Sequence, residues 1–372
     1  MSMNSNKKIT LMISSLSGGG AEGVCVNIAN SFAKRGWQVD LVILNLNDEA
    51  YRNRLLDSVK LVVLNVNHAR YSIIPLLKYI NKNKPKIVLV FNYELSVMLL
   101  ILRSLFRFKF KIISRNINIL SIKLKQLKEQ NFWIKYIVSN LIKYFYNKLD
   151  HVVNQCDAMR DDLIKMYPKL SGTSSVINNP LSSYIENYVN KNDLNQIKKD
   201  NYILCVGSLE KQKAFHYAIE TFAKISNKFP KLRLKIVGQG SLEKDLKLKA
   251  IHWGISSRVD FEGFQKDIIP YYLYAKVTIL TSLYEGYPNV LIESIALNTP
   301  VVSFDCPSGP SEIIRDGFNG YLAKHLDVED FYRKLSIVLT NEFNNKDLKS
   351  SIKNNRIEKV FHDYEKLIKS FN

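Results

Sequence analysis

Hydrophobic and polar positions alternate in blocks along the chain, and these blocks predict strands separated by helices. The short β-branched runs KITLMI and QVDLVI flank a segment in which Val24, Ile28 and Phe32 recur at helical spacing. A glycine run precedes this segment and Gly36 follows it, as expected at the two ends of a helix. We therefore predict a strand, a glycine loop, a helix and a second strand in succession.

The same alternation continues to the end of the chain and is interrupted once by a polar, weakly periodic stretch. Further runs typical of buried strands are KLVVLNV, KIVLVF, FKIISRN and HVVNQC before this stretch, and YILCVGSL, LRLKIVG, VDFEGF, KVTILTS and PVVSFD after it. The pattern predicts an α/β fold of two tandem Rossmann-like domains whose parallel sheets face a central cleft. The expected divisions are a first domain at 1–182, a linker at 183–198, a second domain at 199–355 and a helix at 356–372 that returns to the first domain.

Length and composition agree with two folded domains. The chain has 372 residues, of which 46% are hydrophobic and 23% are charged. Its four cysteines are far apart inside apolar segments, which predicts buried, reduced thiols in a reducing compartment. The apolar run that begins at Ile9 is short and leads into the glycines, so we expect a first strand rather than a signal peptide. Asn92 and Glu94 break the longest apolar run, and no membrane-spanning segment is predicted.

The net charge of +19 is shared unevenly between the two halves. Residues 1–180 carry 26 Lys and Arg against 11 Asp and Glu, whereas residues 181–372 carry 27 against 23. Within the first half, residues 101–150 combine 11 basic and 2 acidic side chains with many aromatic ones. Such a mixture suits an anionic membrane surface or a nucleic acid, and the simpler alternative is a solvated basic face on ordinary helices.

The segment YEGYPNVLIE holds the most specific chemical signal. Glu285 lies in the loop after a predicted strand, Pro288 is expected to open a helix, and Glu293 lies inside that helix. The two carboxylates would bracket the free N–H groups of a helix start, which carries partial positive charge and binds phosphate. A nucleoside diphosphate sugar bound there would present sugar hydroxyls on one side and ribose hydroxyls on the other, each suited to one carboxylate.

This segment resembles the E-x7-E motif of family 4 glycosyltransferases, the retaining enzymes of the GT-B fold. The similarity covers nearly the whole chain, through SLSGGGAEGVCVNIANSFAKRG, VINNPL, VGSLEKQKAFHYAIETFAKI, LKIVGQGSLEKDLK and VVSFDCPSGPSEIIRDGFNGYL. One E-x7-E is a weak signal, but five elements in the same order make a strong one.

The resemblance implies a role for each site residue. Glu285 would contact the donor sugar, Lys213 the diphosphate and Glu293 the ribose. Further donor-binding positions would be Gly207, Ser208, Gly238, Gly286, Tyr287, Pro288 and Asn289. The acceptor or diphosphate loop of the first domain would comprise Gly18, Gly19, Gly20, Arg115 and Asn116.

The chain departs from the family at two positions. Ser208 stands where members usually carry an arginine, and Arg115 with Asn116 stands where many have a histidine. Whether Arg115 replaces the missing cation is left open by the sequence. No D-x-D occurs and the six histidines are scattered, so we expect no metal and no cofactor, with Lys213 and the helix start neutralising the leaving group.

The leading interpretation is a cytoplasmic retaining glycosyltransferase, peripheral on the inner face of the plasma membrane, that acts in O-antigen, capsule or related polysaccharide synthesis. The resemblance suggests a nucleotide-sugar donor, with UDP expected, carrying a hexose or N-acetylhexosamine. The acceptor would be an undecaprenyl-diphosphate-linked glycan and the docking partner an anionic membrane, with no nucleic acid. A nucleotide-sugar epimerase and a non-catalytic nucleic-acid-binding protein remain alternatives. An oxidoreductase is disfavoured because no acidic residue closes the second predicted strand VDLVILNLN until Asp48, and a glycoside hydrolase because the helix start is oriented for phosphate.

Overall fold

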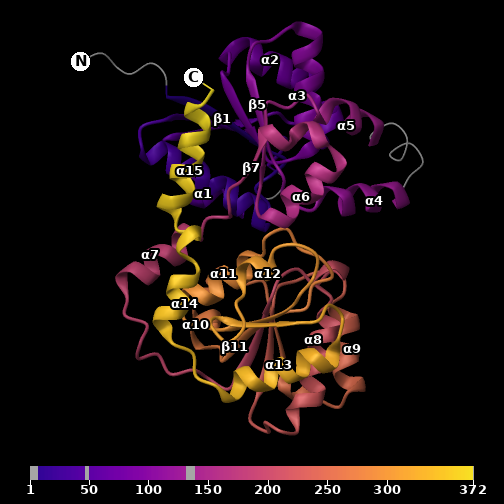
Figure 1. Cartoon of the computed structure of the whole chain (residues 1–372), viewed down its shortest axis with the longest axis vertical. Helices are drawn as coiled ribbons and strands as arrows, with labels where there is room; N and C mark the ends of the chain where they lie inside the picture. Colours follow the sequence, from indigo (N-terminus) through magenta and orange to yellow (C-terminus); the bar gives the residue numbers. More distant parts are fainter. Residues whose placement is uncertain (1–6, 47–49, 131–138, 372) are drawn as a thin grey trace. The chain divides into compact units, whose positions relative to one another are not determined.

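The computed structural model describes residues 7–46, 50–130 and 139–371. The chain divides into two compact units, one formed by Met1–Ser182 with Ile357–Asn372 and the other by Ser183–Arg356. Figure 1 labels the helices and some of the strands of both. The C-terminal helix α15 therefore belongs to the first unit.

The first unit is built on one parallel sheet of seven strands, in the order β3-β2-β1-β4-β5-β6-β7. Its strands are β1 (Lys8–Ile13), β2 (Gln38–Ile43), β3 (Val59–Val63), β4 (Ile87–Val90), β5 (Lys111–Arg115), β6 (His151–Asn154) and β7 (Ser174–Val176). Its helices are α1 (Gly20–Lys34), α2 (Ile73–Asn83), α3 (Tyr93–Phe106), α4 (Leu120–Gln130), α5 (Ser139–Tyr146), α6 (Asp157–Met166) and α15 (Ile357–Lys369).

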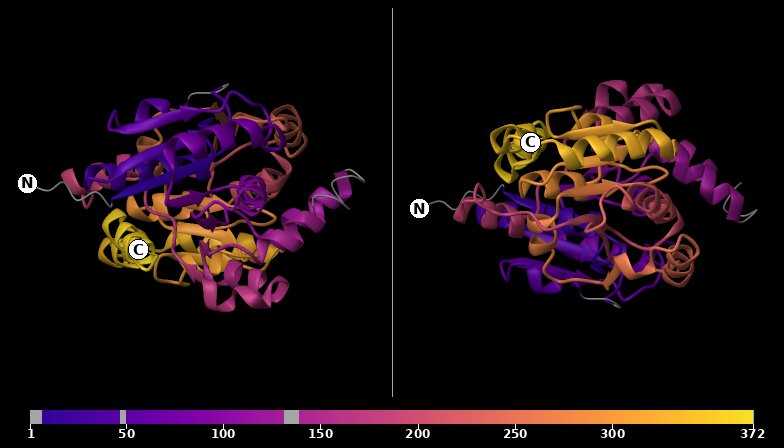
Figure 2. Two further views of the ribbon diagram at one scale, coloured as in Figure 1. Left: turned by 90° about the horizontal axis from the view of Figure 1, so that it is seen from above. Right: turned by 90° about the horizontal axis from the view of Figure 1, so that it is seen from below.

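Helices cover both faces of this sheet, as the two further views in Figure 2 show. One core packs strand residues such as Ile9 and Ile113 against α1 and α15, and the other packs Val88 and Ile112 against α2, α3 and α5. Burial on both faces explains why the strands read as continuous β-branched runs. The predicted first strand, glycine loop, helix and second strand are confirmed as β1, the loop before α1, α1 and β2.

The second unit repeats this plan with a parallel sheet of six strands, in the order β10-β9-β8-β11-β12-β13. Its strands are β8 (Tyr202–Val206), β9 (Arg233–Val237), β10 (Val259–Gly263), β11 (Val277–Leu280), β12 (Val301–Phe304) and β13 (Gly320–Ala323). Its helices are α7 (Ser183–Lys191), α8 (Phe215–Ser226), α9 (Glu243–His252), α10 (Ile269–Tyr274), α11 (Asn289–Ala296), α12 (Pro310–Ile313), α13 (Val328–Thr340) and α14 (Asn345–Ser351). The prediction of two Rossmann-like α/β units with parallel sheets is confirmed.

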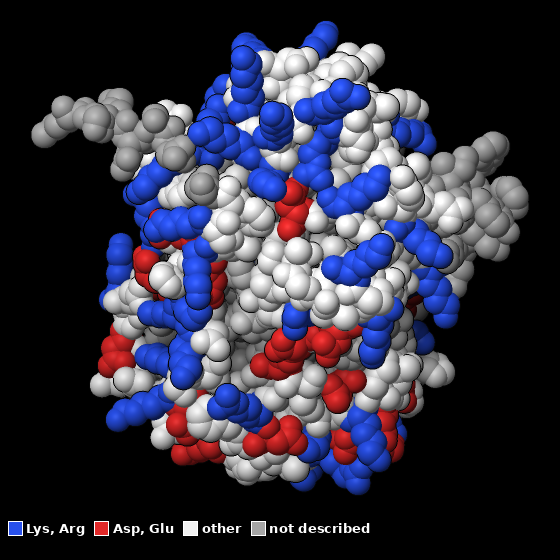
Figure 3. Space-filling view, turned by 45° about the horizontal axis from the view of Figure 1, so that its top comes forward, with Lys and Arg blue, Asp and Glu red and all other residues white. Residues whose placement is uncertain are grey.

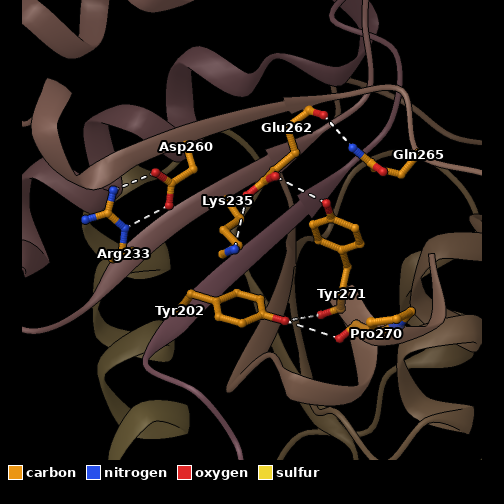
Figure 4. A network of polar contacts seen from close by, with 8 residues as sticks. All are labelled: Tyr202, Arg233, Lys235, Asp260, Glu262, Gln265, Pro270 and Tyr271. Carbon is orange, nitrogen blue, oxygen red and sulfur yellow. Dashed lines mark hydrogen bonds and ion pairs between the residues drawn. The ribbon is translucent and has the colours of Figure 1, made fainter. Parts of the chain in front are cut away.

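Polar pairs join the outer strands of the second sheet (Figure 4). Arg233 on β9 donates two hydrogen bonds to Asp260 on the edge strand β10, at 2.8 and 2.5 Å. Lys235 contacts Glu262 at 3.1 Å, and Glu262 also accepts from the hydroxyl of Tyr271 at 3.2 Å. Charged side chains on an edge strand discourage pairing with another chain, so this network has a structural explanation.

Residues 183–198, predicted as a linker, contain a helix. Residues 183–191 form α7, and the second unit begins at Ser183 rather than at 199. Ile185 and Leu194 are buried, and Glu186 forms an ion pair with Arg356 at 2.9 Å. Because the buried apolar residues are few and widely spaced, the apolar positions show little helical periodicity. This is why the sequence pattern predicted a linker.

Two further expectations concern membranes and thiols. In the described part of the chain, no helix is both long enough and apolar enough to cross a bilayer. The four cysteines, Cys25, Cys156, Cys205 and Cys306, are free and buried, as predicted.

Candidate functional site

A buried ion pair lies at the carboxyl ends of two neighbouring strands in the second unit. Lys213 follows β8 and Glu285 follows β11, and the Lys213 Nζ atom lies 2.6 Å from Glu285 Oε1. The same oxygen accepts a hydrogen bond from Ser282 Oγ at 2.6 Å. The Lys213 side chain is 17% exposed and that of Glu285 is 8% exposed. The sequence separation is 72 residues, and the parallel sheet brings the two loops together.

Further hydrogen bonds fix these two loops to each other. The Leu283 N–H donates to the carbonyl of Gln212 at 2.8 Å, and Gln212 Nε2 donates to the carbonyl of Tyr284 at 3.0 Å. Thr281 Oγ1 donates to the carbonyl of Lys213 at 3.0 Å. The lysine and the carboxylate are therefore held by their backbones as well as by their mutual attraction.

Helix α11 begins directly after this loop. Its first residue is Asn289, so Pro288 precedes the helix instead of opening it as predicted. Glu293 lies in the second turn, half-buried, and accepts a hydrogen bond from the Tyr272 hydroxyl at 3.2 Å. Glu285 and Glu293 thus stand on either side of the helix start, where backbone N–H groups have no partner within the helix.

The glycines after β8 and β9 allow a close approach of two loops. A Cβ atom on Gly238 would lie 1.9 Å from the carbonyl oxygen of Gly207, and both glycines have positive φ angles, 137° and 152°. A Cβ on Gly207 would lie 3.2 Å from Cε of Lys213. Gly207 therefore leaves room for the lysine stem, and Gly238 is required for the contact with its neighbour. Ser208, which directly follows Gly207, is exposed.

A third loop, after β12, packs on the Glu285 loop and was missed by the sequence reasoning as a site element. Ser308 Oγ donates to the carbonyl of Gly286 at 2.9 Å, and the Glu285 N–H donates to the carbonyl of Pro307 at 3.3 Å. Burial, followed by the nearby charge of Glu285, raises the pKa of the Cys306 thiol to about 12. The S-G-P sequence after a buried strand was the available signal, because it marks a tight turn at the same sheet edge.

Tyr287 is buried beside this loop. Its hydroxyl accepts a hydrogen bond from Asn355 Nδ2 at 3.1 Å. The phenol therefore contacts the last residues of the second unit. Tyr287 is one of the predicted donor-binding residues, and this contact gives it a structural role.

The glycine loop of the first unit lies between β1 and α1. Gly18 has a φ of 106°, Gly19 is the N-cap residue of α1 and Gly20 is its first residue. A Cβ on Gly19 would lie 2.5 Å from a carboxylate oxygen of Glu22. Burial raises the pKa of Glu22, against the opposing effect of hydrogen bonds from its own backbone N–H and from Ser15.

Arg115 and Asn116, predicted for the acceptor or diphosphate loop, lie at the end of β5 and directly after it. Arg115 ends β5, is 1% exposed, and donates to the carbonyl of Ile177, to Asn179 Oδ1 and to the hydroxyl of Tyr364 on α15. The Arg115 guanidinium is therefore directed at groups of its own unit.

Asn116 is also part of a buried network. Its Nδ2 donates to Asn154 Oδ1 at 2.9 Å, its carbonyl accepts from Gln155 Nε2 at 3.0 Å, and its Oδ1 accepts from the hydroxyl of Tyr146. The amides after β5 and β6 therefore brace the strand ends against one another. This explains the Asn-rich sequence of these loops without a ligand.

The predicted site residues thus fall into two groups. The second unit brings Lys213, Glu285 and Glu293 to one sheet edge, and the first unit places its glycine loop after β1 and Arg115 with Asn116 at the end of β5. Among the described residues, no group of three or more His, Cys, Asp and Glu side chains is arranged to hold a metal ion. Figure 3 shows Lys and Arg covering much of the first unit, with Asp and Glu gathered on the second.

Two family models together match most of the chain. "Glycosyltransferase Family 4" matches residues 18–182, and "Glycosyl transferases group 1" matches residues 188–358. The two matches correspond closely to the two structural units.

Three relatives are informative. An "Uncharacterized glycosyltransferase" of Haemophilus influenzae is 28% identical over 90% of this chain and 91% of its own. The "Amylovoran biosynthesis glycosyltransferase AmsD" of Erwinia amylovora is 26% identical over 90% and 91%. A Campylobacter jejuni 4-alpha-N-acetylgalactosaminyltransferase, named for a diphospho-undecaprenol substrate, is 27% identical over 54% of each chain.

Solved structures share the fold over almost the entire length. The lipopolysaccharide outer core galactosyltransferase WaaB has a TM-score of 0.73 at 20% identity, covering 98% of this chain and 99% of its own. Anabaena HepE in complex with UDP-glucose has a TM-score of 0.74 at 17% identity, covering 98% and 99%.

Proposed function

Because this chain belongs to the family 4 type of glycosyltransferases with the GT-B fold, we propose that it transfers a hexose or N-acetylhexosamine, with retention, from a UDP sugar to a lipid-linked oligosaccharide. The observation that carries the proposal is the Lys213–Glu285 pair beside the start of α11, with Glu293 in the next turn of the helix. The product would be an intermediate of a surface polysaccharide or lipopolysaccharide.

The donor would bind at this sheet edge of the second unit. Its diphosphate would bind to the partly positive N-terminus of α11 and to the Lys213 ammonium. Glu293 would accept hydrogen bonds from the ribose hydroxyls, and Glu285 from the sugar to be transferred. Glu285 neutralises Lys213 in this ion pair, so donor binding would exchange part of the pair for contacts with phosphate and sugar.

The chemistry is a substitution at the anomeric carbon. The acceptor oxygen forms a bond to that carbon while its bond to the diphosphate oxygen breaks, and the acceptor proton passes to the departing diphosphate. Attack from the same face as the leaving group retains the configuration. Lys213 and the N–H groups of α11 would stabilise the charge that develops on the diphosphate, an effect that is largest in a site excluded from water.

Relatives support the acceptor class. The C. jejuni relative is named for a sugar carried by diphospho-undecaprenol, and the E. amylovora relative is named for amylovoran biosynthesis. Carried over to this chain, these names favour an undecaprenyl-diphosphate-linked glycan as acceptor. HepE was solved with UDP-glucose, which supports a UDP sugar as donor.

A lipid-linked acceptor requires approach to a membrane, and the first unit offers a suitable surface. Leu105 and Phe106 at the end of α3 are 71% and 51% exposed, and Tyr144 on α5 is 63% exposed. Arg107 follows Phe106 directly, and the Lys148 ammonium lies 4.0 Å from the centre of the Tyr144 ring. Exposed aromatic rings beside cations suit the headgroup region of an anionic bilayer, so we infer peripheral binding to the cytoplasmic leaflet. Phe132, Trp133, Lys135 and Tyr136, which belong to the same basic and aromatic segment, lie outside the described residues.

The proposal is tested by incubating the purified protein with UDP-hexoses, UDP-N-acetylhexosamines and synthetic undecaprenyl-diphosphate oligosaccharides. The expected result is a lengthened, lipid-linked glycan with the anomeric configuration of the donor, determined by NMR. Inverted product would contradict retention, and epimerised donor without any transfer would favour the epimerase alternative. A covalent glycosyl-enzyme trapped on a side chain would exclude the one-step substitution.

The same assay tests the expectation that no divalent metal is needed. Lys213 and the α11 start are proposed to neutralise the diphosphate, so transfer should continue in excess chelator. Complete loss of transfer in chelator, restored by magnesium or manganese, would show that a metal does this work.

A further inference from the structure

We propose that Ser308 is a positioning residue for the donor loop, an inference that rests on the proposed function. Its hydroxyl is buried and donates to the carbonyl of Gly286 at 2.9 Å. Gly286 directly follows Glu285, and its peptide group leads into the start of α11. Ser308 therefore fixes the backbone that carries the carboxylate without itself needing to contact the substrate.

The backbone at Ser308 has a conformation that serine rarely adopts. Ser308 has a φ of 70° and Gly309 a φ of 75°, so two consecutive residues have a positive φ. For a residue with a side chain a positive φ is unfavourable, and such strain is typically kept where the surrounding structure has a use for it. A glycine at 308 would adopt this backbone freely but would lack the hydroxyl.

The neighbouring contacts explain what the strain achieves. A Cβ on Gly309 would lie 2.6 Å from the carbonyl oxygen of Gly286 and 2.7 Å from Cδ of Pro288, so the loop after β12 lies directly on the Glu285 loop. The Glu285 N–H also donates to the carbonyl of Pro307 at 3.3 Å. Two hydrogen bonds, one at the Glu285 N–H and one at the Gly286 carbonyl, therefore join the two loops. The donor at the Gly286 carbonyl is the Ser308 side chain.

Two substitutions separate the hydroxyl from the backbone strain. Ser308→Ala removes the hydroxyl and keeps the strain, whereas Ser308→Gly removes both. We expect kcat for transfer to fall in both variants, on the order of three- to tenfold, as for the loss of one buried hydrogen bond. The KM for the donor should change less, because Glu293 and the diphosphate contacts are untouched. The thermal midpoint should be lower for Ser308→Ala than for Ser308→Gly.

The inference is overturned if Ser308→Gly has both the kcat and the thermal midpoint of the wild-type protein. That result would mean that only the backbone conformation at residue 308 matters. Unchanged kcat in both variants would overturn it as well. Leu326→Gly is a matched control, because Leu326 also has a positive φ, 61°, in the same unit and is 42% exposed; it should leave kcat unchanged. Failure of the proposed function is distinct, since the wild-type protein would then neither bind a nucleotide sugar nor catalyse transfer.

Discussion

The two units share one architecture but use the carboxyl ends of their strands differently. In the second unit, the strand-end loops converge on a charged pair, Lys213 and Glu285, and on a helix start. In the first unit, Arg115 at the end of β5 and Asn116 directly after it donate hydrogen bonds to groups of the same unit. We therefore propose the ligand site for the second unit, where a charged pair and a helix start lie together at the strand ends.

The difference extends to charge. The first half of the chain carries a net charge of +15 and the second half +4. The donor diphosphate is nevertheless assigned to the nearly balanced half, because two loops and a helix start gather there. The excess positive charge is spread over a surface, which suits a membrane better than a single small anion.

The largest effect is expected at Lys213. Lys213→Ala should lower kcat by ~10²- to 10³-fold, because it removes the cation next to the departing diphosphate and leaves Glu285 buried without it. The exposed neighbour Lys211 provides the control, since Lys211→Ala removes a cation from the same short helical turn. Steady-state kinetics with saturating acceptor make the comparison. Equal effects of the two substitutions would show that only the overall charge of the loop matters.

Arg115 should behave in the opposite way. Arg115→Met should lower the free energy of unfolding by about 2 to 4 kcal/mol, because it removes the buried hydrogen bonds that Arg115 donates to Ile177 and Asn179. Nucleotide-sugar binding should be unchanged. Urea denaturation and donor titration measure the two quantities, with the exposed Arg107→Met as control. Intact stability combined with weakened substrate binding would return Arg115 to the ligand site and remove the contrast between the units.

The two glutamates should separate binding from turnover. Glu293→Ala should raise the KM for the donor about tenfold, because ribose contacts are the same in ground and transition states. Glu285→Ala should mainly lower kcat, by roughly 10- to 100-fold, because contacts to the transferred sugar change as the bond breaks. Glu342→Ala, at an exposed position of the same unit, serves as control. Small and equal effects of both substitutions on both parameters would refute the assignment of roles.

Much of this contrast could be predicted from sequence. Glu285 and Glu293 lie on one loop and the helix that follows it, so their spacing along the chain nearly fixes their spacing in space. The buried contacts of Arg115 could not be predicted, because its partner Tyr364 is 249 residues away in the sequence. Ser308 was missed for the same reason, since its contact with Gly286 spans 22 residues and involves a main-chain carbonyl that no residue pattern reveals. Apolar runs likewise predicted β1 to β6 and β8 to β12, but they did not predict the short strands β7 and β13. They also failed for α7, which few apolar residues anchor.

The basic surface of the first unit should matter for membranes and not for the donor. Neutralising Lys123, Lys125, Lys128 and Lys135 together should weaken binding to anionic vesicles, and less protein should sediment with them. The expected loss of binding free energy is about 1 kcal/mol for each lysine near the membrane surface. High salt should release the wild-type protein, because exposed charges are screened beyond about 8 Å at physiological ionic strength. Unchanged vesicle binding, or salt-resistant binding to nucleic acid, would favour the nucleic-acid alternative.

The smallest effect is expected from His151 in the first unit. Burial lowers the pKa of His151 to about 4, while its Nε2 atom lies 2.9 Å from Ser175 Oγ. Between this pKa and the ordinary value near 6.5, the unfolded chain binds more protons than the folded one, so stability falls as pH decreases. From pH 7 to pH 5.5 the loss should be about 1 kcal/mol. His151→Gln should show a smaller loss over this range in urea denaturation, and an identical pH dependence would assign the effect to other groups.

The central claim is that the second unit holds a nucleotide-sugar site built around Lys213, Glu285 and Glu293. It is tested most directly by the thermal stability of the wild-type protein and of Glu293→Ala across a series of nucleotide sugars without acceptor. The account predicts that at least one UDP sugar stabilises the wild-type protein, by about 2.7 kcal/mol at 100 times its dissociation constant. It also predicts that Glu293→Ala needs about tenfold more ligand for the same shift. No stabilisation by any nucleotide sugar, or equal stabilisation of both proteins, would contradict it.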